Sequence, residues 1–577
     1  MGLFEPQRGL FQNKSKNGAF SGLWTLSQKA LAGYTLGMRK TNIILTVLAL
    51  FCGSVVAAPS EAEIEEKIRK TAEGLGMSYY EEFPVYGSSM GSLKGGGTGS
   101  ASESLHISNS LPVPEPQLSL QSSEPPSLTF SEHATLYMGY AHLIWNGISS
   151  QVTDSGFFSK NAPSFDEISK NLIKRASVSS YGTRKSGEKT LFSEAGFVSE
   201  FEKVTGSKFM DGNAVKFLVD GGESFKYKDY LMKNAKKSIY VTTWAFYDDR
   251  TGLDTFNILA EKKKQGVDVK IIADGTVMDS HGVSIINKLG KAGIEVVKHS
   301  EKRRTSDIWH VKVIVVDGRY AIAGGMNFGD PYSHKDPQGE KWRDTDVLYM
   351  GPAVDEAVKF FAGIWNGEVS RQKLKFGKID ASSSNAPQGK ARISLSYSNP
   401  PDAQGTSILA GIIKAMYGAT KVINIENAYF VPIPALSQAI LDARARGVEV
   451  NILTNSEDSV NHKQVSDISM KSMLPLYQAG ANIYLKQGET LHSKFMTVDG
   501  IYCSIGSYNM HPRGERYDSE VNVNIIDEES VASLDEVFKR DVANLSKQVT
   551  SAKELMPDQG WISNIVEKYF FAQLGKK

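Results

Sequence analysis

One stretch of this chain occurs twice, and this repeat limits the fold more than any other feature. Each copy has a histidine, a lysine two positions later, an aspartate five positions after the lysine, and a small-residue turn that ends in asparagine. The copies lie 182 positions apart. By chance, one His-x-Lys-x4-Asp pattern is expected on the order of a few hundredths of a time in such a chain. The repeated side chains are His310, Lys312, Asp317, Gly324 and Asn327, and then His492, Lys494, Asp499, Gly506 and Asn509.

Each copy has the pattern of a β-hairpin. Residues 309–316 are rich in β-branched side chains and predict a strand, and residues 491–498 give a weaker form of the same signal. Residues two apart on a strand share a face, so the histidine and lysine of each copy should point the same way. The motif aspartate precedes a glycine, which is typical of a turn. The small residues after the next strand should then bring Asn327 and Asn509 back beside the histidines.

The repeated side chains suit chemistry on a phosphate group. Two imidazoles suggest one nucleophile and one general acid. Two ammonium groups and two carboxamides suggest donors to a group with several anionic oxygens. In-line attack on phosphorus needs one group on each side, which explains why both copies are present. The plain alternative is two unrelated hairpins with surface His and Lys, but hairpins do not require the same polar set twice.

Three further stretches, considered with the repeated motifs, indicate which protein family this chain resembles. They are Gly324-Gly325-Met326-Asn327, the segment 342–354 that begins Trp-Arg-Asp-Thr-Asp, and Gly506-Ser507-Tyr508-Asn509. Together with the motif pair, they resemble the phospholipase D superfamily, and more narrowly its bacterial cardiolipin synthase branch, over residues 215–541. The resemblance implies a two-step transfer through a phosphohistidine. By analogy with the family, His310 is the nucleophile and His492 is the general acid and base. The sequence alone does not show which histidine has which role.

A histidine in this chemistry needs a carboxylate behind it, to fix its tautomer and to stabilise the imidazolium. The resemblance implies an acidic residue at the start of a strand downstream of each motif, which points to Asp344 and Glu520. Asp346 is a rival to Asp344, because the two should share a strand face. The alternative for each is a surface acid on an edge strand. By resemblance, Asp317 and Asp499 are structural ties of the motifs and not proton carriers.

The chain between the motifs alternates strands and helices, which predicts an α/β layer structure. Residues 264–269 and 445–450 match almost residue for residue, and glycines after the helices are typical of helix ends. We therefore expect two homologous α/β/α sandwich halves, the phospholipase D fold, related by a pseudo-twofold. Both motifs should lie in the cleft between the halves. Aromatic runs at 244–247 and 429–432 stand at equivalent strand ends, where they either wall the cleft or belong to the core.

The rest of the chain divides by composition. The basic stretch Met38-Arg39-Lys40 precedes an apolar run, and this run ends in small residues. This pattern is typical of an export signal. An uncleaved anchor is the alternative. The sequence leaves the role of residues 59–210 open. The predicted units are 1–58 (extension plus signal, about 38–58), 59–130 (short helix and low-complexity linker), 131–210 (mostly helical), 211–385 and 386–530 (the two halves), and 531–577 (helical tail).

The expected function is a phospholipase D-type phosphodiesterase or phosphatidyltransferase that acts on phospholipids. The chain should be exported to the periplasm or secreted, or be associated with a membrane, and one chain carries a complete site, so a monomer suffices. No cofactor or metal is expected, because Lys and Asn supply the positive field. The net charge of +1 argues against a nucleic-acid partner.

The acceptor and the headgroup stay open at this point. Water as the acceptor would make the enzyme a hydrolase, and a lipid hydroxyl would make it a transferase. The export signal makes hydrolysis more credible than the resemblance alone does. A secreted nuclease of the same superfamily and a non-catalytic lipid-binding member are the alternatives.

Overall fold

The computed structural model describes residues 113, 116, 129, 164–177, 184–186, 188–299, 308–399, 405–460 and 463–556. The predicted export signal lies outside the described residues, as does the linker apart from three single positions. Within the described part, every helix is too short or too polar to cross a membrane.

The first half is a mixed sheet covered by helices. β2, β3 and β4 are parallel, because α8 and α10 cross back between them, and the motif hairpin β6–β7 pairs antiparallel beside them. Its strands are β1 (Met210–Val219), β2 (Ser238–Thr243), β3 (Asp268–Asp274), β4 (Glu295–His299), β5 (Ile308–Trp309), β6 (Val313–Val316), β7 (Tyr320–Gly324) and β8 (Thr345–Met350). Its helices are α7 (Asp220–Asn234), α8 (Arg250–Lys264), α9 (Met278–His281), α10 (Val283–Lys291), α11 (Asp330–Ser333) and α12 (Ala353–Gln372).

The second half repeats this order. Three parallel strands are followed by a motif hairpin, a further strand and a long helix. Its strands are β9 (Ala391–Ser398), β10 (Val422–Asn427), β11 (Glu449–Asn455), β12 (Asn482–Lys486), β13 (Lys494–Val498), β14 (Tyr502–Gly506), β15 (Asp518–Ile526) and β16 (Ser546–Gln548). Its helices are α13 (Ser407–Gly418), α14 (Pro434–Ala445), α15 (Lys463–Gln478) and α16 (Glu528–Leu545), with short 3-10 turns η3 (Pro512–Glu515) and η4 (Ala552–Leu555).

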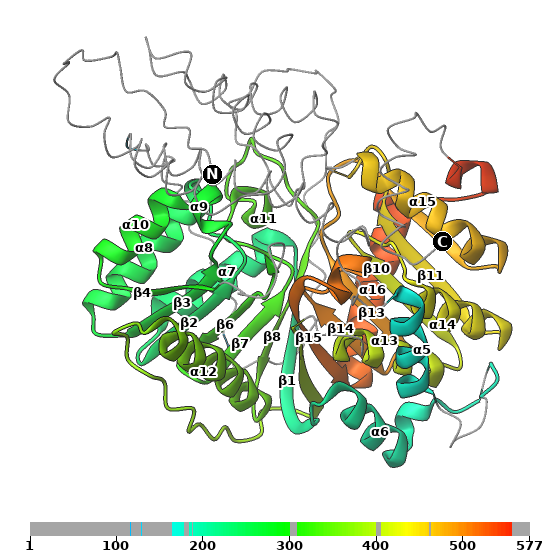
Figure 1. The fold of residues 1–577 in the computed structure, drawn as a ribbon, viewed down its shortest axis with the longest axis horizontal. Helices are drawn as coiled ribbons and strands as arrows, with labels where there is room; N and C mark the ends of the chain where they lie inside the picture. The colour runs from blue at the N-terminus through cyan, green and yellow to red at the C-terminus, as the bar shows by residue number, and fades with distance from the viewer. Residues whose placement is uncertain are drawn as a thin grey trace, which may run out of the picture. The chain divides into compact units, whose positions relative to one another are not determined.

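The two sheets join through β9 and β1, which pair antiparallel with a register irregularity between Met210 and Asn213. Along the joined sheet the order is β16-β12-β11-β10-β13-β14-β15-β9-β1-β8-β7-β6-β2-β3-β4, and β5 pairs with β15 off this path (Figure 1). β15 also contacts β7, and β14 contacts β7 and β8, although other strands lie between them in the sheet. The central strands of the two halves therefore pack against each other.

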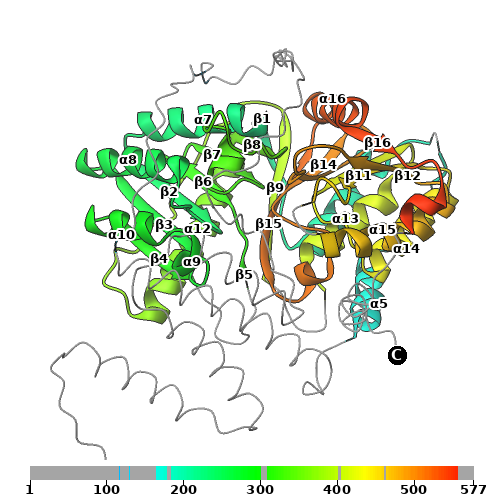
Figure 2. The same ribbon diagram turned by 90° about the horizontal axis from the view of Figure 1, so that it is seen from above.

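Helices cover both faces of each half (Figure 2). Three large apolar clusters fill the layers between the helices and the sheets. In the first half, α7, α8 and α10 cover one face, and α12 covers the other. In the second half, α13, α14 and α15 cover one face, and α16 covers the other. The cluster under α12 and α16 takes side chains from both halves, so the halves share one central core. These layers confirm the predicted fold class.

Two regions to which the sequence assigns no clear role, 131–210 and 531–577, contribute elements that pack on the second half. α5 (Phe165–Ala176), which begins with a capping box from Ser164 to Glu167, and α6 (Ala195–Thr205) join its outer core beside α13. The predicted tail contains most of α16, which supplies a layer of the second half, and β16, which pairs with β12. The limits of the predicted units stay predictions.

Candidate active site

Both motif hairpins place their polar ends at one edge of their sheet. β6 runs antiparallel to β2 and β7, so the start of β6 lies beside the ends of β2 and β7. His310 precedes β6 and Asn327 follows β7. In the second half, β13 has the same relation to β10 and β14, with His492 before β13 and Asn509 after β14. The strand pairing thus groups the repeated side chains of each copy at one edge.

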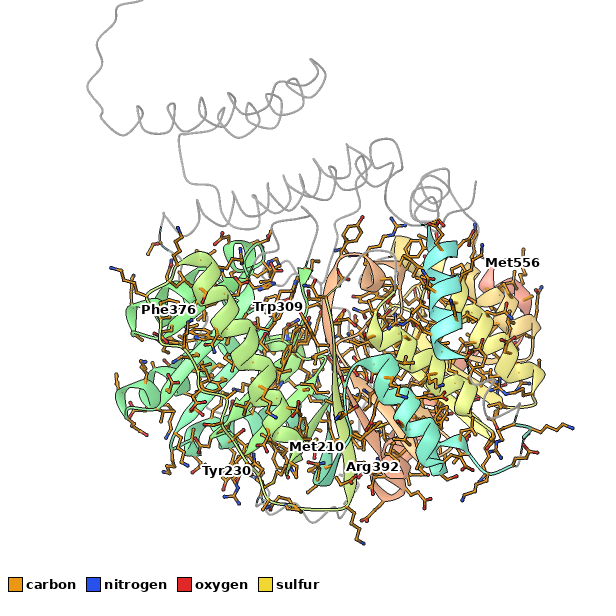
Figure 3. The ribbon with its side chains drawn as sticks, turned by 60° about the horizontal axis from the view of Figure 1, so that its bottom comes forward. Met210, Tyr230, Trp309, Phe376, Arg392 and Met556 are labelled. Atoms are coloured by element: carbon orange, nitrogen blue, oxygen red, sulfur yellow. The ribbon has the colours of Figure 1, made fainter. Side chains whose placement is uncertain are left out.

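The first motif is not the single strand that was predicted over 309–316. β5 ends at Trp309 and β6 begins at Val313, so His310 lies between two strands. The reason is a change of partner: β5 pairs in parallel with β15 of the other half, whereas β6 pairs with β2 and β7 of its own half. Trp309, labelled in Figure 3, stands opposite Ser519 in that parallel pair, and the His310 N–H donates to the Ser519 carbonyl at 2.9 Å.

Each motif histidine takes its carboxylate from the opposite half. Nδ1 of His310 lies 2.9 Å from both carboxyl oxygens of Glu520, and Nδ1 of His492 lies 2.7 Å from Oδ2 of Asp344. All four side chains are buried, with at most 3% of the residue exposed. The predicted acids both lie beside a histidine, but the exchange between halves is a feature that the sequence did not indicate. It makes the two half-sites mutually dependent.

The two carboxyls differ in their proton affinity. Burial raises the pKa of the Glu520 carboxyl, and the attraction of His310 reduces this effect without reversing it. Burial also acts to raise the pKa of the Asp344 carboxyl, but the charge and hydrogen bond of His492, with the charge of Lys494, hold it below its usual value. Asp344 is therefore the more firmly ionised partner.

Asp346, the rival to Asp344, has a different partner set. Its carboxylate accepts from Ser224 Oγ at 2.5 Å and lies 2.8 Å from Nζ of Lys228, both on α7. The expectation that Asp344 and Asp346 share a strand face is wrong. Asp344 precedes β8, which begins at Thr345, so the strand alternation does not extend to it. The structure thus places Asp344 at the histidine, and Asp346 on the outer layer.

The motif aspartates bind main-chain N–H groups and lie away from the histidines' ring nitrogens. Asp317 accepts from the N–H groups of residues 236, 237 and 238 at 2.7–3.0 Å. Asp499 accepts from those of residues 420, 421 and 422 at 2.7–2.9 Å. Both aspartates have a left-handed backbone, with φ of 56° and 54°, as the predicted turns require. Each carboxylate therefore ties its hairpin turn to the start of the neighbouring strand.

The motif lysines and asparagines supply polar groups within the buried edge. Nζ of Lys494 lies 3.1 and 3.2 Å from the two ring nitrogens of His492, and Nζ of Lys312 donates to the His310 carbonyl at 3.1 Å. In the described part of the chain, Nδ2 of Asn327 and Oδ1 of Asn509 are buried without a hydrogen-bond partner. Buried polar atoms of this kind are costly unless something pairs with them.

Among the residues that the structure describes, no cluster of three His, Cys, Asp or Glu side chains is arranged to hold a metal ion. The polar groups at the site are imidazoles, carboxylates, ammonium groups and amides. This set can attack, protonate and neutralise a phosphodiester.

Comparison with known proteins agrees with this geometry. The family model described as "Cardiolipin synthase, PLD-like domain" matches residues 230–338 and 412–542, which contain both motifs. A cardiolipin synthase of Staphylococcus aureus strain Mu50 is 29% identical over 355 residues, which cover 59% of this chain and 69% of that protein. The chain belongs to the phospholipase D superfamily.

Two further proteins are similar to this chain, one in sequence and one in fold. A cardiolipin synthase of Listeria monocytogenes serotype 4a is 29% identical over 346 residues, 58% of this chain and 70% of that protein. The crystal structure of a phosphatidylserine synthase from Haemophilus influenzae superposes with a TM-score of 0.54 at 17% identity, covering 65% of this chain and 97% of that one. The similarity to the phosphatidylserine synthase concerns the fold alone.

The small-residue turns of this candidate site leave room for the carboxylates. A Cβ on Gly325 would come within 2.3 Å of a carboxyl oxygen of Asp344, so no other residue fits there without moving it. At the corresponding turn of the second half, Ser507 exchanges hydrogen bonds with the main chain of Val521 at 3.0 and 3.2 Å. The Gly/Asn tail is therefore part of the support for the histidine–carboxylate pairs.

Sequence reasoning missed one pair of supporting residues in this superfamily member. The Asp274 carboxylate accepts the Trp309 N–H at 2.8 Å, and Oδ1 of Asn455 accepts the Leu491 N–H at 2.9 Å. Both end the middle parallel strand of their half, β3 and β11, and both hold the residue just before the motif histidine. An alignment of the two repeats could have identified them, because Asp274 and Asn455 occupy equivalent positions at the ends of equivalent strands.

Aromatic rings surround both histidines, and all of them are buried. Trp244, from a predicted aromatic run, has its ring centre 6.5 Å from that of His310. Tyr332 and Trp342 lie 5.1 and 5.5 Å from the His492 ring. Tyr332 was not predicted, because it lies on α11 outside any motif pattern. Rings of this kind exclude water and strengthen the electrostatic interactions at the site.

Proposed function

We propose that this chain is a phospholipase D-type phosphodiesterase or phosphatidyltransferase that acts on phospholipids. The observation that carries the proposal is the crossed arrangement of two imidazoles, each with Nδ1 on a buried carboxylate of the other half. In this proposal the carboxylates fix the tautomer through Nδ1, and Nε2 of each ring takes part in the chemistry. The family match and the cardiolipin synthase relatives support a phosphatidyl group as the transferred unit.

In the proposed first step, Nε2 of His310 attacks the phosphodiester phosphorus. A P–N bond forms while the P–O bond to the leaving alcohol breaks, and His492 gives that oxygen its proton. In the second step His492 takes a proton from the acceptor hydroxyl, whose oxygen attacks phosphorus and releases His310. The Asp344 carboxyl, whose pKa is held below its usual value, can stabilise positive charge on the ring beside it, which supports His492 as the acid and base.

Lys312, Lys494, Asn327 and Asn509 are proposed to bind the non-bridging oxygens of the phosphate. Their charge and N–H groups offset the negative charge that grows as phosphorus is attacked. The unpartnered Nδ2 of Asn327 supports this role, because a phosphate oxygen would satisfy it. In this scheme the chain needs no metal ion.

We also propose that the chain is exported and works on a membrane surface as a monomer. The apolar run that follows Met38-Arg39-Lys40 supports export, and the presence of both motifs in one chain supports a complete site in a monomer. The acceptor is water or a lipid hydroxyl, and the histidine chemistry is the same for both.

The direct test is to incubate the full chain with phosphatidylglycerol vesicles and to follow the lipid products. Phosphatidic acid with free glycerol would identify water as the acceptor. Cardiolipin with free glycerol would identify transfer between lipids. If neither appears, while single-stranded DNA is cleaved in a parallel reaction, the phospholipid assignment is wrong and a nuclease replaces it.

A further inference from the structure

One buried cation joins the two halves next to the second motif. The guanidinium of Arg343, in the segment before β8, donates from Nε to the carboxylate of Asp541 on α16 at 2.6 Å. Its Nη2 lies 3.4 Å from Oε1 of Glu426 on β10. Only 4% of Arg343 is exposed, and both acidic partners are fully buried. A first-half side chain is thus anchored inside the second half.

The same guanidinium holds the chain around Asp344. Nη1 of Arg343 donates to the Asp344 carbonyl at 2.5 Å and to Oγ1 of Thr345 at 2.7 Å. Oγ1 of Thr345 also accepts from the hydroxyl of Ser493 at 2.9 Å. The position of the Asp344 main chain therefore depends on where the guanidinium sits, and the Asp344 carboxylate is the partner of His492.

The main chain of Arg343 holds the histidine itself. Its carbonyl accepts the N–H of His492 at 2.7 Å and that of Ser493 at 3.1 Å, and its own N–H donates to the Thr490 carbonyl at 2.8 Å. One residue thus contacts the segments on both sides of the Asp344–His492 hydrogen bond.

The first motif has no equivalent of this arginine. Gly324 pairs with Asp346 and Gly506 pairs with Asn522, so the counterparts of Asp344 and Arg343 are Glu520 and Ser519. A serine cannot reach across the halves as a guanidinium does. The Ser519 carbonyl accepts the His310 N–H at 2.9 Å, as the Arg343 carbonyl accepts that of His492, so only the guanidinium support is specific to the His492 half of the site.

We propose that Arg343, anchored by Asp541, is a positioning residue that sets the geometry of the Asp344–His492 pair. The inference rests on the proposed two-histidine function. Arginine suits this task because its planar group donates in several fixed directions at once, which a lysine ammonium on a flexible stem does not reproduce. The distances identify the anchor: Nε of Arg343 lies 2.6 Å from the Asp541 carboxylate, whereas its Nη2 lies 3.4 Å from Glu426, whose pKa burial raises to about 8.

The test compares Arg343→Lys with Arg444→Lys as a matched control. Arg444, on α14, also donates to main-chain carbonyls, those of Val448 and Ala479, but lies outside the motif contacts. We expect Arg343→Lys to lower kcat about 100-fold with KM changed less than threefold, since misplacing a proton donor affects the transition state more than substrate binding. Arg444→Lys should change neither value more than twofold.

A second readout does not depend on turnover. The proton between His492 Nδ1 and Asp344 should give a far-downfield NMR signal that is absent from His492→Asn. Arg343→Lys should shift or remove it, and Arg444→Lys should keep it. If wild-type protein turns over no phospholipid, the proposed function fails, and this signal still decides the role of Arg343.

The proposal is overturned if Arg343→Lys keeps kcat within threefold of wild type, if the loss lies in KM alone, or if the proton signal is unchanged. If Arg343→Lys does not fold, Asp541→Asn decides by the same readouts, because it keeps the arginine and removes its charged anchor. That variant should lower kcat about tenfold and move the signal, and a wild-type result for it contradicts the proposal.

Discussion

At the residue scale, the site consists of two imidazoles whose carboxyl partners are alike in geometry but differ in proton affinity. Glu520 has a raised carboxyl pKa and Asp344 a lowered one, because His492 and Lys494 together stabilise the Asp344 carboxylate more than its burial destabilises it. A nucleophile that must be neutral and an acid that must be protonated need such different environments. In the proposed mechanism, this difference between the two carboxyls supports His310 as the nucleophile and His492 as the acid and base.

Removing the charge of either carboxylate should slow turnover by about 10²–10⁴-fold, because the histidine loses its orientation and its stabilised imidazolium. The variants are Asp344→Asn and Glu520→Gln, and kcat with phosphatidylglycerol vesicles is the measurement. Circular dichroism checks that both remain folded. A variant with wild-type kcat would show that its carboxylate does not act on the histidine.

The same two variants should differ in how stability depends on pH. A raised pKa means that the stability contribution of Glu520 is present below the unfolded pKa and is lost as pH rises through the folded value. A lowered pKa means that the contribution of Asp344 is already complete above its unfolded pKa. Between pH 4.5 and 7.5, the Tm deficit of Glu520→Gln should therefore shrink, and that of Asp344→Asn should stay constant. The reverse pattern would contradict the pKa assignment.

Most residues of the site could be predicted from the sequence because the motif repeats. His310 and His492 follow from the pattern alone, and Glu520 from the family resemblance, which implies an acidic residue at the start of a strand after each motif. The choice between Asp344 and Asp346 could not be made, since it depends on where β8 begins. The exchange of carboxylates between halves depends on packing of distant segments, and spacing along the chain carries no information about it.

At the element scale, the hairpin turns hold the motifs in place. Asp317 and Asp499 each accept main-chain N–H groups from the start of the neighbouring strand. The predicted hairpins and their tight turns are present, whereas the continuous strand over 309–316 is not. The β-branched residues predict extended chain, but they do not show with which strand each part of it pairs. The chain breaks at His310 because β5 pairs with β15 and β6 pairs with β2.

Asp317→Ala should act on stability rather than on chemistry. It leaves main-chain donors of residues 236–238 without their acceptor and places alanine at a φ of 56°, which should lower the free energy of unfolding by about 1–3 kcal/mol. Urea denaturation measures the loss, and kcat of the folded fraction should stay within fivefold of wild type. A large fall in kcat at unchanged stability would make Asp317 a proton carrier.

Gly325→Ala should misplace Asp344 without touching either histidine. The new methyl would meet the Asp344 carboxylate at 2.3 Å, and a displacement of about 1 Å at a reacting group can cost about 10²-fold in kcat. Gly290→Ala on α10 is the control, because its Cβ meets no atom within 4 Å. Equal kcat in the two variants would show that the turn adapts and that Gly325 is not needed for the carboxylate.

At the scale of the whole molecule, neither half can make its site alone. Each histidine depends on a carboxylate from the other half, the central core takes side chains from both, and Arg343 is anchored across the boundary. The duplicated fold could be predicted from the repeat itself. The joining of the halves through β9 and β1 could not, because neither strand carries a motif.

Glu426→Gln should raise stability increasingly with pH. The pKa of Glu426 is raised to about 8 by burial, so its stability contribution is present below the unfolded pKa near 4.5 and is lost as pH rises through the folded value. Gln keeps the shape without the ionisation. The Tm of the variant should exceed that of wild type by a few degrees at pH 8.5, and by less at pH 5. A constant Tm difference across this range would show that Glu426 does not titrate there.

The central claim is that one histidine carries the phosphatidyl group and the other moves protons. The measurement is to mix the full chain with phospholipid radiolabelled at phosphorus, quench in alkali, and look for label on the protein. Wild type should retain alkali-stable label. His492→Ala should gain this label more slowly, because it lacks the proton donor of the first step, and His310→Ala should retain none. Both variants should lose steady-state turnover. Label on His310→Ala alone would exchange the two roles, and wild-type turnover by either variant would contradict the two-histidine account.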